Sequence, residues 1–305
     1  MASSNNDEGD SRGSASVEVA AGRLGVLTFD HHDRDVVGLT YVYPVVSRRA
    51  RGVSIGINLN PNNACNWRCV YCQVPELVRG MAPPIDLAQL ERELNRMLAA
   101  VTGGDFLARH VPPELRNLRD VALSGNGEPT SSPQFREVLE IVVRALGRVS
   151  LSVPIVVITN GSLVDRASVR EALRTLGTIQ GRLWFKLDAG SDAGMAAANS
   201  ANTHVARHVA RLALASTLCP TWVQSCWFVR RDREPDPKEV DAYVSLLSAL
   251  VEDRVPIRGV LLYTLARASS QPEAAELRPV SQPWLQCLGE RLRAAGLSVD
   301  IASAE

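Results

Sequence analysis

The chain has 305 residues, which fits one large domain or two modest ones at the usual size of about 100–200 residues per domain. Hydrophobic residues make up 46% and charged residues 22%, an ordinary balance that excludes collagen, coiled coil and wholesale disorder. The 33 basic and 33 acidic residues cancel, so the composition does not support a general electrostatic attraction to nucleic acid.

The first sixteen residues are rich in Ser, Asn, Asp and Gly and contain no apolar core. This composition is not that of a secretory signal, and it predicts a disordered tail over residues 1–20, followed by a single domain over 21–305. We therefore expect a cytoplasmic protein. In a reducing compartment, clustered cysteines indicate metal binding more often than disulfides.

Past this tail, short β-rich apolar runs alternate with longer segments of helical spacing. The alternation predicts strands at 53–58, 120–124, 155–159, 182–187, 222–228 and 258–263, and a short final strand at 297–301. It predicts helices at 86–100, 134–146, 166–176, 203–218, 238–251 and 282–295. Asp86 is expected to cap the first helix and Gly296 to end the last.

These elements form six strand-then-helix units, which imply an α/β fold with a parallel sheet covered by helices. Six units are too few for a closed eight-unit barrel, so an open or partial barrel or a doubly wound sheet is indicated. In all of these folds, ligands bind beyond the carboxyl ends of the strands. The residues that follow each strand are therefore the candidate site residues.

Three of the six cysteines follow the first strand with C-x3-C-x2-C spacing, at Cys65, Cys69 and Cys72. Such spacing lets one loop wrap three thiolates around an iron–sulfur cube and leaves one iron open to another ligand. An open coordination position is typical of a reactive site. Two alternatives remain, namely small buried side chains on one helix face, and a zinc site whose fourth ligand is not evident nearby.

A glycine-rich run, Gly125, Asn126, Gly127 and Glu128, follows the second strand. Glycines let the backbone approach a ligand closely, and exposed backbone groups there can bond the zwitterionic end of an amino acid. Taken alone, the run is equally an ordinary strand-to-helix turn.

Polar residues follow the other strands as well: Thr159 and Asn160, Lys186 and Asp188, Gln224, and Tyr263 with Arg267. Lys186 and Asp188 are two residues apart, so both side chains lie on one face of the strand. Facing inward, each charge needs a partner. Facing outward, the pair would be a surface salt bridge.

The cysteine motif, with the aromatic Tyr71 directly before Cys72, resembles the signature of the radical S-adenosylmethionine (SAM) superfamily. The run Gly125 to Glu128 is similar to that superfamily's second motif. Further segments resemble one largely uncharacterised group of iron–sulfur oxidoreductases related to the radical enzyme of wybutosine biosynthesis: 44–49, 54–58, 124–130, 159–162, 186–190, 223–226 and 263–267. The resemblance covers about residues 38–300.

The resemblance implies a partial (βα)6 barrel and one [4Fe–4S] cluster held by the three cysteines. SAM would chelate the fourth iron, and one-electron reduction would release a 5′-deoxyadenosyl radical that abstracts hydrogen from a substrate. Cofactor contacts are implied for the glycine-rich run with its methionyl group, Thr159 and Asn160 with ribose or carboxylate, the backbone near Tyr71 with adenine, and Lys186 and Asp188 deeper in the barrel. Gln224, Tyr263 and Arg267 are implied on the substrate side.

The resemblance also implies an external one-electron donor of flavodoxin or ferredoxin type. Cys219, Cys226 and Cys287 form no second compact cluster, so an auxiliary iron–sulfur cluster is not expected. The substrate class stays open between an RNA base and a small metabolite or peptide, and the balanced charge favours the latter. A non-enzymatic zinc or iron–sulfur module is the alternative function.

A pair of histidines and a group of three arginines are further candidate ligand contacts. His204 and His208 are four residues apart on a predicted helix, a spacing that can bind zinc but also occurs on ordinary helices. Arg48, Arg49 and Arg51 precede the first strand. They suit a phosphate or carboxylate, and equally surface salt bridges or carbonyl contacts.

Overall fold

The structure is a computed structural model that describes residues 25–28, 38–47 and 51–302. The expected disordered tail over 1–20, as well as Arg48 and Arg49, lie outside the described residues. Within the described ranges, none of the helices is both long enough and apolar enough to cross a membrane.

In the described part of the chain, eight strands form one sheet in the order β1-β2-β5-β6-β7-β8-β10-β12. Only β1 runs antiparallel to its neighbour, and the other pairs are parallel. The strands are β1 (Val42–Ser47), β2 (Gly52–Ile57), β5 (Leu118–Leu123), β6 (Ile155–Thr159), β7 (Gly181–Lys186), β8 (Thr221–Cys226), β10 (Ile257–Tyr263) and β12 (Val299–Ala302).

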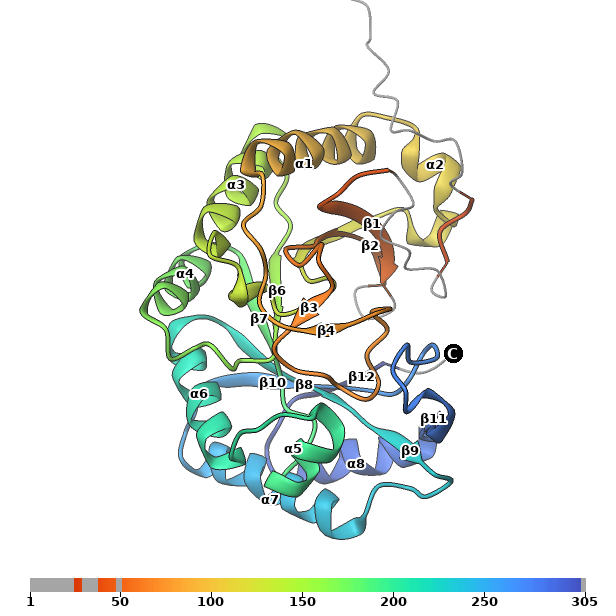
Figure 1. Cartoon of the computed structure of the whole chain (residues 1–305), viewed down its shortest axis with the longest axis vertical. Coiled ribbons are helices and arrows are strands. Elements are labelled where there is room, and N and C mark those ends of the chain that lie inside the picture. The colour runs from red at the N-terminus through yellow and green to blue at the C-terminus, as the bar shows by residue number, and fades with distance from the viewer. Residues whose placement is uncertain (1–24, 29–37, 48–50, 303–305) are drawn as a thin grey trace, which may run out of the picture.

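The longer helices follow the parallel strands and cover the outer side of the curled sheet (Figure 1). The helices of the described residues are α1 (Leu87–Thr102), α2 (Phe106–His110), α3 (Phe135–Arg148), α4 (Ala167–Thr178), α5 (Asp192–Asn199), α6 (Val205–Leu218), α7 (Pro237–Glu252) and α8 (Gln282–Ala294). Four short strands lie outside the main sheet: β3 (Ala64–Cys65) pairs with β4 (Val78–Arg79), and β9 (Phe228–Arg230) pairs with β11 (Leu277–Pro279).

The local sequence explains these elements. β2 is buried at every position, and within the sheet it lies between β1 and β5. Helix α1 presents Leu90, Leu94 and Met97 to the core at helical spacing. Asp86 caps its first turn by accepting a hydrogen bond from the backbone N–H of Gln89 at 2.9 Å, as expected. The amphipathic helices therefore pack onto the sheet along one apolar stripe each.

All six strand-then-helix units are confirmed, and so is the partial-barrel fold class. Gly296 ends the last helix with a φ of 87°, a conformation that glycine adopts readily. The expected strand at 222–228 is too long, because β8 ends at Cys226 and the chain then leaves the sheet to form β9. β1 was not expected, and as an edge strand it accommodates Pro44.

The buried histidine His208 lies on α6 between Trp67 and Phe185, whose ring centroids are 5.2 and 4.7 Å from its own. Its Nε2 donates to the backbone carbonyl of Lys186 at 2.8 Å, while Nδ1 has no partner among the described residues. Burial holds the pKa of His208 at about 4. His204 is exposed and pairs with Asp192 instead, so the two histidines do not converge on one metal ion.

We predict that His208 makes the fold acid-sensitive. Unfolded His208 binds a proton below about pH 6.5, whereas the folded side chain stays neutral down to about pH 4. Stability therefore falls as the pH drops through this window, by about 3 kcal/mol from this residue. His208→Gln keeps a donor for the carbonyl but cannot titrate, so urea denaturation between pH 4 and 6.5 should give a shallower dependence.

Phe185→Leu is the matched control, because it loosens the same packing without removing a titrating group. It should lower the free energy of unfolding by a similar amount at every pH. A pH dependence of His208→Gln as steep as that of the wild type would contradict the prediction.

Candidate active site

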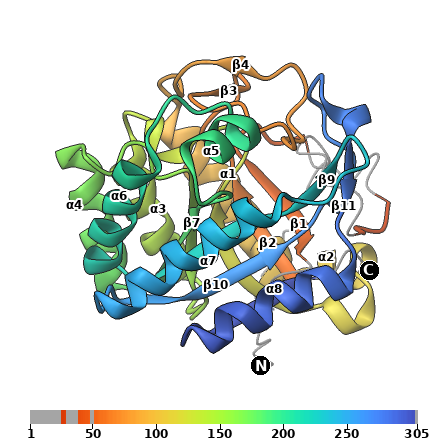
Figure 2. The same cartoon turned by 90° about the horizontal axis from the view of Figure 1, so that it is seen from below.

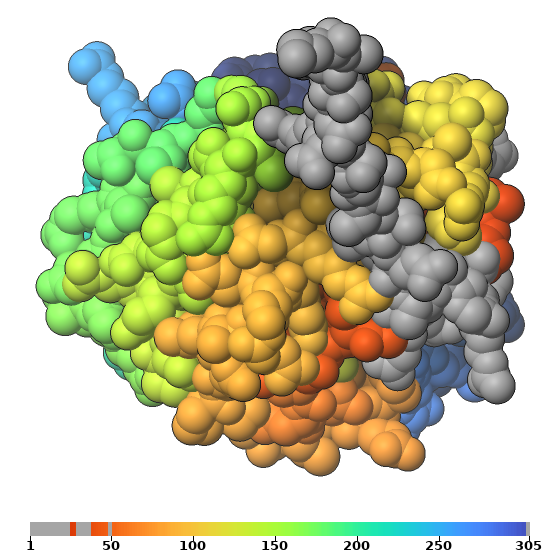
Figure 3. Space-filling view, turned by 90° about the horizontal axis from the view of Figure 1, so that it is seen from above, coloured from red at the N-terminus to blue at the C-terminus, as the bar shows by residue number. Residues whose placement is uncertain are grey.

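A cavity of about 330 Å³ opens at the carboxyl ends of the parallel strands. The segment with β3 and β4 lies at this end of the molecule, beyond the sheet (Figure 2), and together with α1 it forms a continuous stretch of the surface (Figure 3). The predicted site residues that line the cavity are Cys65, Cys69, Tyr71, Cys72, Gly125, Asn126, Gly127, Glu128, Asn160, Lys186, Gln224, Tyr263 and Arg267. The fold therefore brings most of them together.

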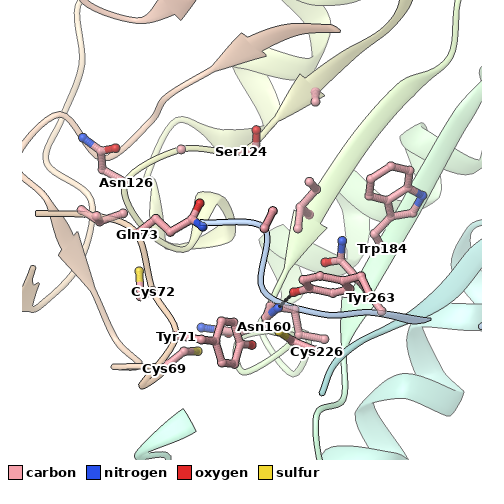
Figure 4. Close-up of a pocket in the computed structure, with 18 of the residues that line it drawn as sticks. Cys69, Tyr71, Cys72, Gln73, Ser124, Asn126, Asn160, Trp184, Cys226 and Tyr263 are labelled. Atoms are coloured by element: carbon pink, nitrogen blue, oxygen red, sulfur yellow. Dashed lines mark hydrogen bonds between the residues drawn. The ribbon is translucent and has the colours of Figure 1, made fainter. Parts of the chain in front are cut away.

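The three cysteines belong to one loop between β2 and α1, and all three are half-buried and line this cavity; Figure 4 labels Cys69 and Cys72. Burial raises the pKa of Cys65 to about 12 and that of Cys69 to about 11. Both thiols are therefore protonated in the metal-free chain, and a bound metal would displace those protons.

Two glycines bring the second motif against this cysteine loop. Gly125 has a φ of 153°, and a Cβ on it would lie 2.4 Å from Oδ1 of Asn58. A Cβ on Gly127 would lie 2.1 Å from the carbonyl oxygen of Ala64, directly before the first cysteine. Only glycine allows the two loops to pack this closely.

Asn58 connects the same two loops. Its Oδ1 accepts hydrogen bonds of 3.0 Å from the backbone N–H groups of Asn60 and Asn126. The side-chain Oδ1 of Asn126 remains buried without a hydrogen-bond partner within the described part of the chain. A buried acceptor without a partner is destabilising unless a bound molecule or water supplies a donor.

Glu128 is 2% exposed and ties the glycine-rich run to the end of β6. Its carboxylate accepts from the hydroxyl of Thr159 at 2.6 Å, the backbone N–H of Asn160 at 2.6 Å, and both donors of Thr130. Burial raises the pKa of Glu128, and these bonds oppose that effect. Thr159 is itself buried and does not line the cavity, whereas Asn160 does.

Asp188 organises a second polar cluster behind the cysteines. It accepts from the hydroxyl of Tyr71, from Nδ2 of Asn199 at 2.7 Å and from the backbone N–H of Cys226 at 2.8 Å. Nζ of Lys186 lies 3.9 Å from the same carboxylate. Lys186 and Asp188 thus face inward, and the outward salt bridge is wrong.

Lys186 extends this cluster into the cavity. Its Nζ donates to the hydroxyl of Tyr263 at 2.8 Å and lies 5.0 Å from the ring centre of Tyr71. Burial is the largest single effect and disfavours its charge, but the Asp188 carboxylate together with Tyr263, Cys69 and Cys226 outweighs burial, and the pKa of Lys186 lies above its ordinary value. The side chain is therefore a cation held at the cavity wall.

The sequence reasoning missed Asn199, which ends the unexpected helix α5. Its Nδ2 donates to Sγ of Cys69 at 3.2 Å as well as to Asp188. Hydrogen bonds to the sulfurs of an iron–sulfur cluster help to set its reduction potential. No spacing rule connects Asn199 to a cysteine 130 residues away.

The sequence also gave no sign that the segment after β10 forms hydrogen bonds with the cysteine loop. Ser269 donates to the carbonyls of Val70 at 2.7 Å and Cys72 at 3.0 Å. Arg68 forms two 2.8 Å bonds with Glu273, a bidentate pair that adds geometric specificity. Arg51, by contrast, is exposed and does not line the cavity.

Comparison with known proteins places this site in context. No family model matches the chain. The UPF0026 protein slr1464 of Synechocystis sp. is 31% identical over 146 residues, which are 47% of this chain and 47% of that protein. The match thus spans about half the length of this curated relative.

Two solved structures are similar in fold. A radical SAM methyltransferase from Sphaerobacter thermophilus aligns over 83% of this chain and 66% of its own, with a TM-score of 0.54 and 16% identity. TYW1 with a lysine-pyruvate adduct bound aligns over 80% of this chain and 74% of its own, with a TM-score of 0.52 and 15% identity. The chain therefore has the partial-barrel fold of radical SAM enzymes.

The close contact at Gly127 generates a prediction. Gly127→Ala places a methyl group against the Ala64 carbonyl, and such overpacking should lower the free energy of unfolding by about 1–3 kcal/mol. The matched control is Gly147→Ala on α3, where a Cβ meets nothing within 4 Å. It should stabilise the helix by about 0.5–1 kcal/mol. Urea denaturation of the metal-free chain measures the free energy of unfolding of both variants. Equal stability of Gly127→Ala and the wild type would contradict the prediction.

Proposed function

We propose that the chain is a radical SAM enzyme that holds one [4Fe–4S] cluster on Cys65, Cys69 and Cys72. One observation carries the proposal: three thiols of a single loop line the same cavity as the glycine-rich run. Within the described ranges, no three His, Cys, Asp or Glu side chains lie close enough to hold a single metal ion. Three separated thiols on one cavity suit a cluster, in which each thiolate binds a different iron.

The cofactor would lie between the cysteine loop and the glycine-rich run. When bound, SAM and the reduced cluster supply a 5′-deoxyadenosyl radical that takes a hydrogen atom from the substrate. Asn126 would bind the amino group of SAM through its unpaired Oδ1, beside Gly125 and Gly127. Asn160 would contact the ribose or carboxylate, while Glu128 and Thr159 hold it in place. The backbone near Tyr71 would face the adenine.

An external one-electron donor of flavodoxin or ferredoxin type would supply the electron. We place the enzyme in the cytoplasm, because its six cysteines are free and a reducing compartment keeps them so. For the substrate, a small molecule or peptide is favoured over RNA. Among the described residues, the cavity lining has two cationic side chains, Lys186 and Arg267, and two acidic ones, Asp120 and Glu128, so this part of the lining has no basic excess for phosphates.

The first test is cluster loading and cofactor cleavage. Chain purified without oxygen and reconstituted with iron and sulfide should be brown and bind about four irons. Dithionite and SAM should then release 5′-deoxyadenosine. We predict that Cys69→Ala lowers both the iron content and cleavage to below about a tenth of the wild type, because a thiolate ligand is lost.

Cys287→Ser is the matched control, because Cys287 is an exposed free cysteine on α8 outside the cavity. It should bind iron and cleave SAM as the wild type does. Cleavage that persists in Cys69→Ala would refute the ligand assignment. A colourless wild type with one tightly bound zinc would instead favour the non-enzymatic module.

A further inference from the structure

Asn199 is a buried amide behind the cysteine loop, and the proposed function assigns it no role. It is the last residue of α5 and is 0% exposed. Its Nδ2 donates to Sγ of Cys69 at 3.2 Å and to Oδ2 of Asp188 at 2.7 Å. One of the two hydrogens of this amide nitrogen is therefore directed at a cysteine sulfur.

The carboxylate of Asp188 fixes the direction in which the Asn199 amide points. A carboxylate can only accept hydrogen bonds, so the NH2 group of Asn199 must face it, and the amide oxygen must face away. Oδ1 of Asn199 has no hydrogen-bond partner among the described residues, so nothing there favours the reversed amide. The N–H group at Cys69 thus follows from the charge of its neighbour.

The backbone on both sides of Cys69 is bound to the same end of α5. The N–H of Arg68 donates to the carbonyl of Asn199 at 3.2 Å, and the N–H of Val70 donates to the carbonyl of Ala198 at 2.9 Å. The last carbonyls of a helix have no partner within the helix, so they are free to accept these bonds. Cys69 is therefore held from both sides, with its sulfur against Nδ2 of Asn199.

The other end of α5 is held by a side chain of α7. The carboxylate of Glu239 accepts from the backbone N–H groups of Gly190 at 2.6 Å and Ser191 at 3.0 Å. Ser191 caps the helix, because its hydroxyl oxygen accepts from the backbone N–H of Gly194 at 3.0 Å. This short helix is bound at both ends, so Asn199 has a defined place relative to the cysteine loop.

We propose, on the basis of the proposed function, that Asn199 is a positioning residue that raises the reduction potential of the [4Fe–4S] cluster through Cys69. Reduction adds one electron from the external donor, and no bond of the chain forms or breaks. Part of the added negative charge lies on the cysteine sulfurs, so a hydrogen bond to a sulfur stabilises the reduced state more than the oxidised state. The bond is shielded from water, which strengthens this effect.

The alternative role of Asn199 is purely structural, as a donor that only stabilises the buried carboxylate of Asp188. Tyr71 provides the matched comparison, because its hydroxyl donates to the same Oδ2 of Asp188. Tyr71→Phe removes one donor from this carboxylate and leaves the bond from Asn199 to Cys69 in place. Variants of the two residues therefore separate a bond to the sulfur from a bond to the carboxylate.

The test measures the midpoint potential of the cluster in enzyme reconstituted with iron and sulfide, without SAM or substrate. The EPR signal of the reduced cluster, recorded at a series of poised potentials, gives this value. We expect Asn199→Leu, which has a similar size but no donor, to shift the midpoint to a more negative potential. The shift should be at least twice that of Tyr71→Phe, because only Asn199→Leu removes a hydrogen bond from a cluster ligand.

A second readout reports the hydrogen bond itself. Resonance Raman spectra of the oxidised cluster contain the stretching bands of the bonds between iron and cysteine sulfur, and these bands move when a hydrogen bond to the sulfur is deuterated. Enzyme that is equilibrated and reconstituted in D₂O should show this change. The change should be smaller in Asn199→Leu, whereas Tyr71→Phe should match the wild type.

The outcomes separate the two proposals. A wild type that binds no four-iron cluster overturns the proposed function and this inference with it. A loaded Asn199→Leu whose midpoint equals that of the wild type, or moves no further than that of Tyr71→Phe, overturns the inference alone. Asn199→Ala replaces Asn199→Leu if leucine prevents cluster loading. If neither variant binds about four irons, Asn199 serves to hold the loop rather than to set the potential, and the inference is again overturned.

Discussion

The contact of Gly127 with the carbonyl of Ala64 is the constraint on which the site depends. At this contact the glycine-rich run packs against the start of the cysteine loop so closely that residue 127 has no room for a side chain. Loops at an open sheet edge gain little from apolar burial, so polar contacts must hold them. Asn58 and Glu128 supply those contacts by accepting backbone N–H groups from both loops and from the end of β6. The result is one hydrogen-bonded edge that joins both loops to the end of β6.

Charge is distributed in the site so that each buried ion has a partner. Asp188 takes donors from β8, α5 and the cysteine loop, and it holds Lys186 as a cation beside Tyr71 and Tyr263. A buried carboxylate without such partners would be strongly destabilising. The same arrangement gives Cys69 a hydrogen bond from Asn199, so the surroundings of Cys69 and of Lys186 are connected through one carboxylate.

Much of this could be predicted from the sequence. The six strand-then-helix units follow from hydrophobic spacing, and the carboxyl-end rule placed the cavity residues at the strand ends. The misses have physical causes. β1 contains Pro44, which argues against a strand until its edge position is known. Helix α5 has only eight residues, too few for a clear periodicity. The hydroxyl of Thr159 donates to Glu128, and its expected contact with the cofactor stays a prediction.

The sequence by itself determined the local part of the protein: the order of the elements, the three cysteines within eight residues and the glycines that must pack closely. Local spacing carries this information because residues a few positions apart are neighbours in any fold. The tertiary structure alone decided which distant groups meet. Strand order and curl bring together Asn199 with Cys69, Ser269 with the carbonyls of Val70 and Cys72, and Lys186 with Tyr263. No pattern along the chain encodes these pairings, since they depend on the packing of the whole sheet.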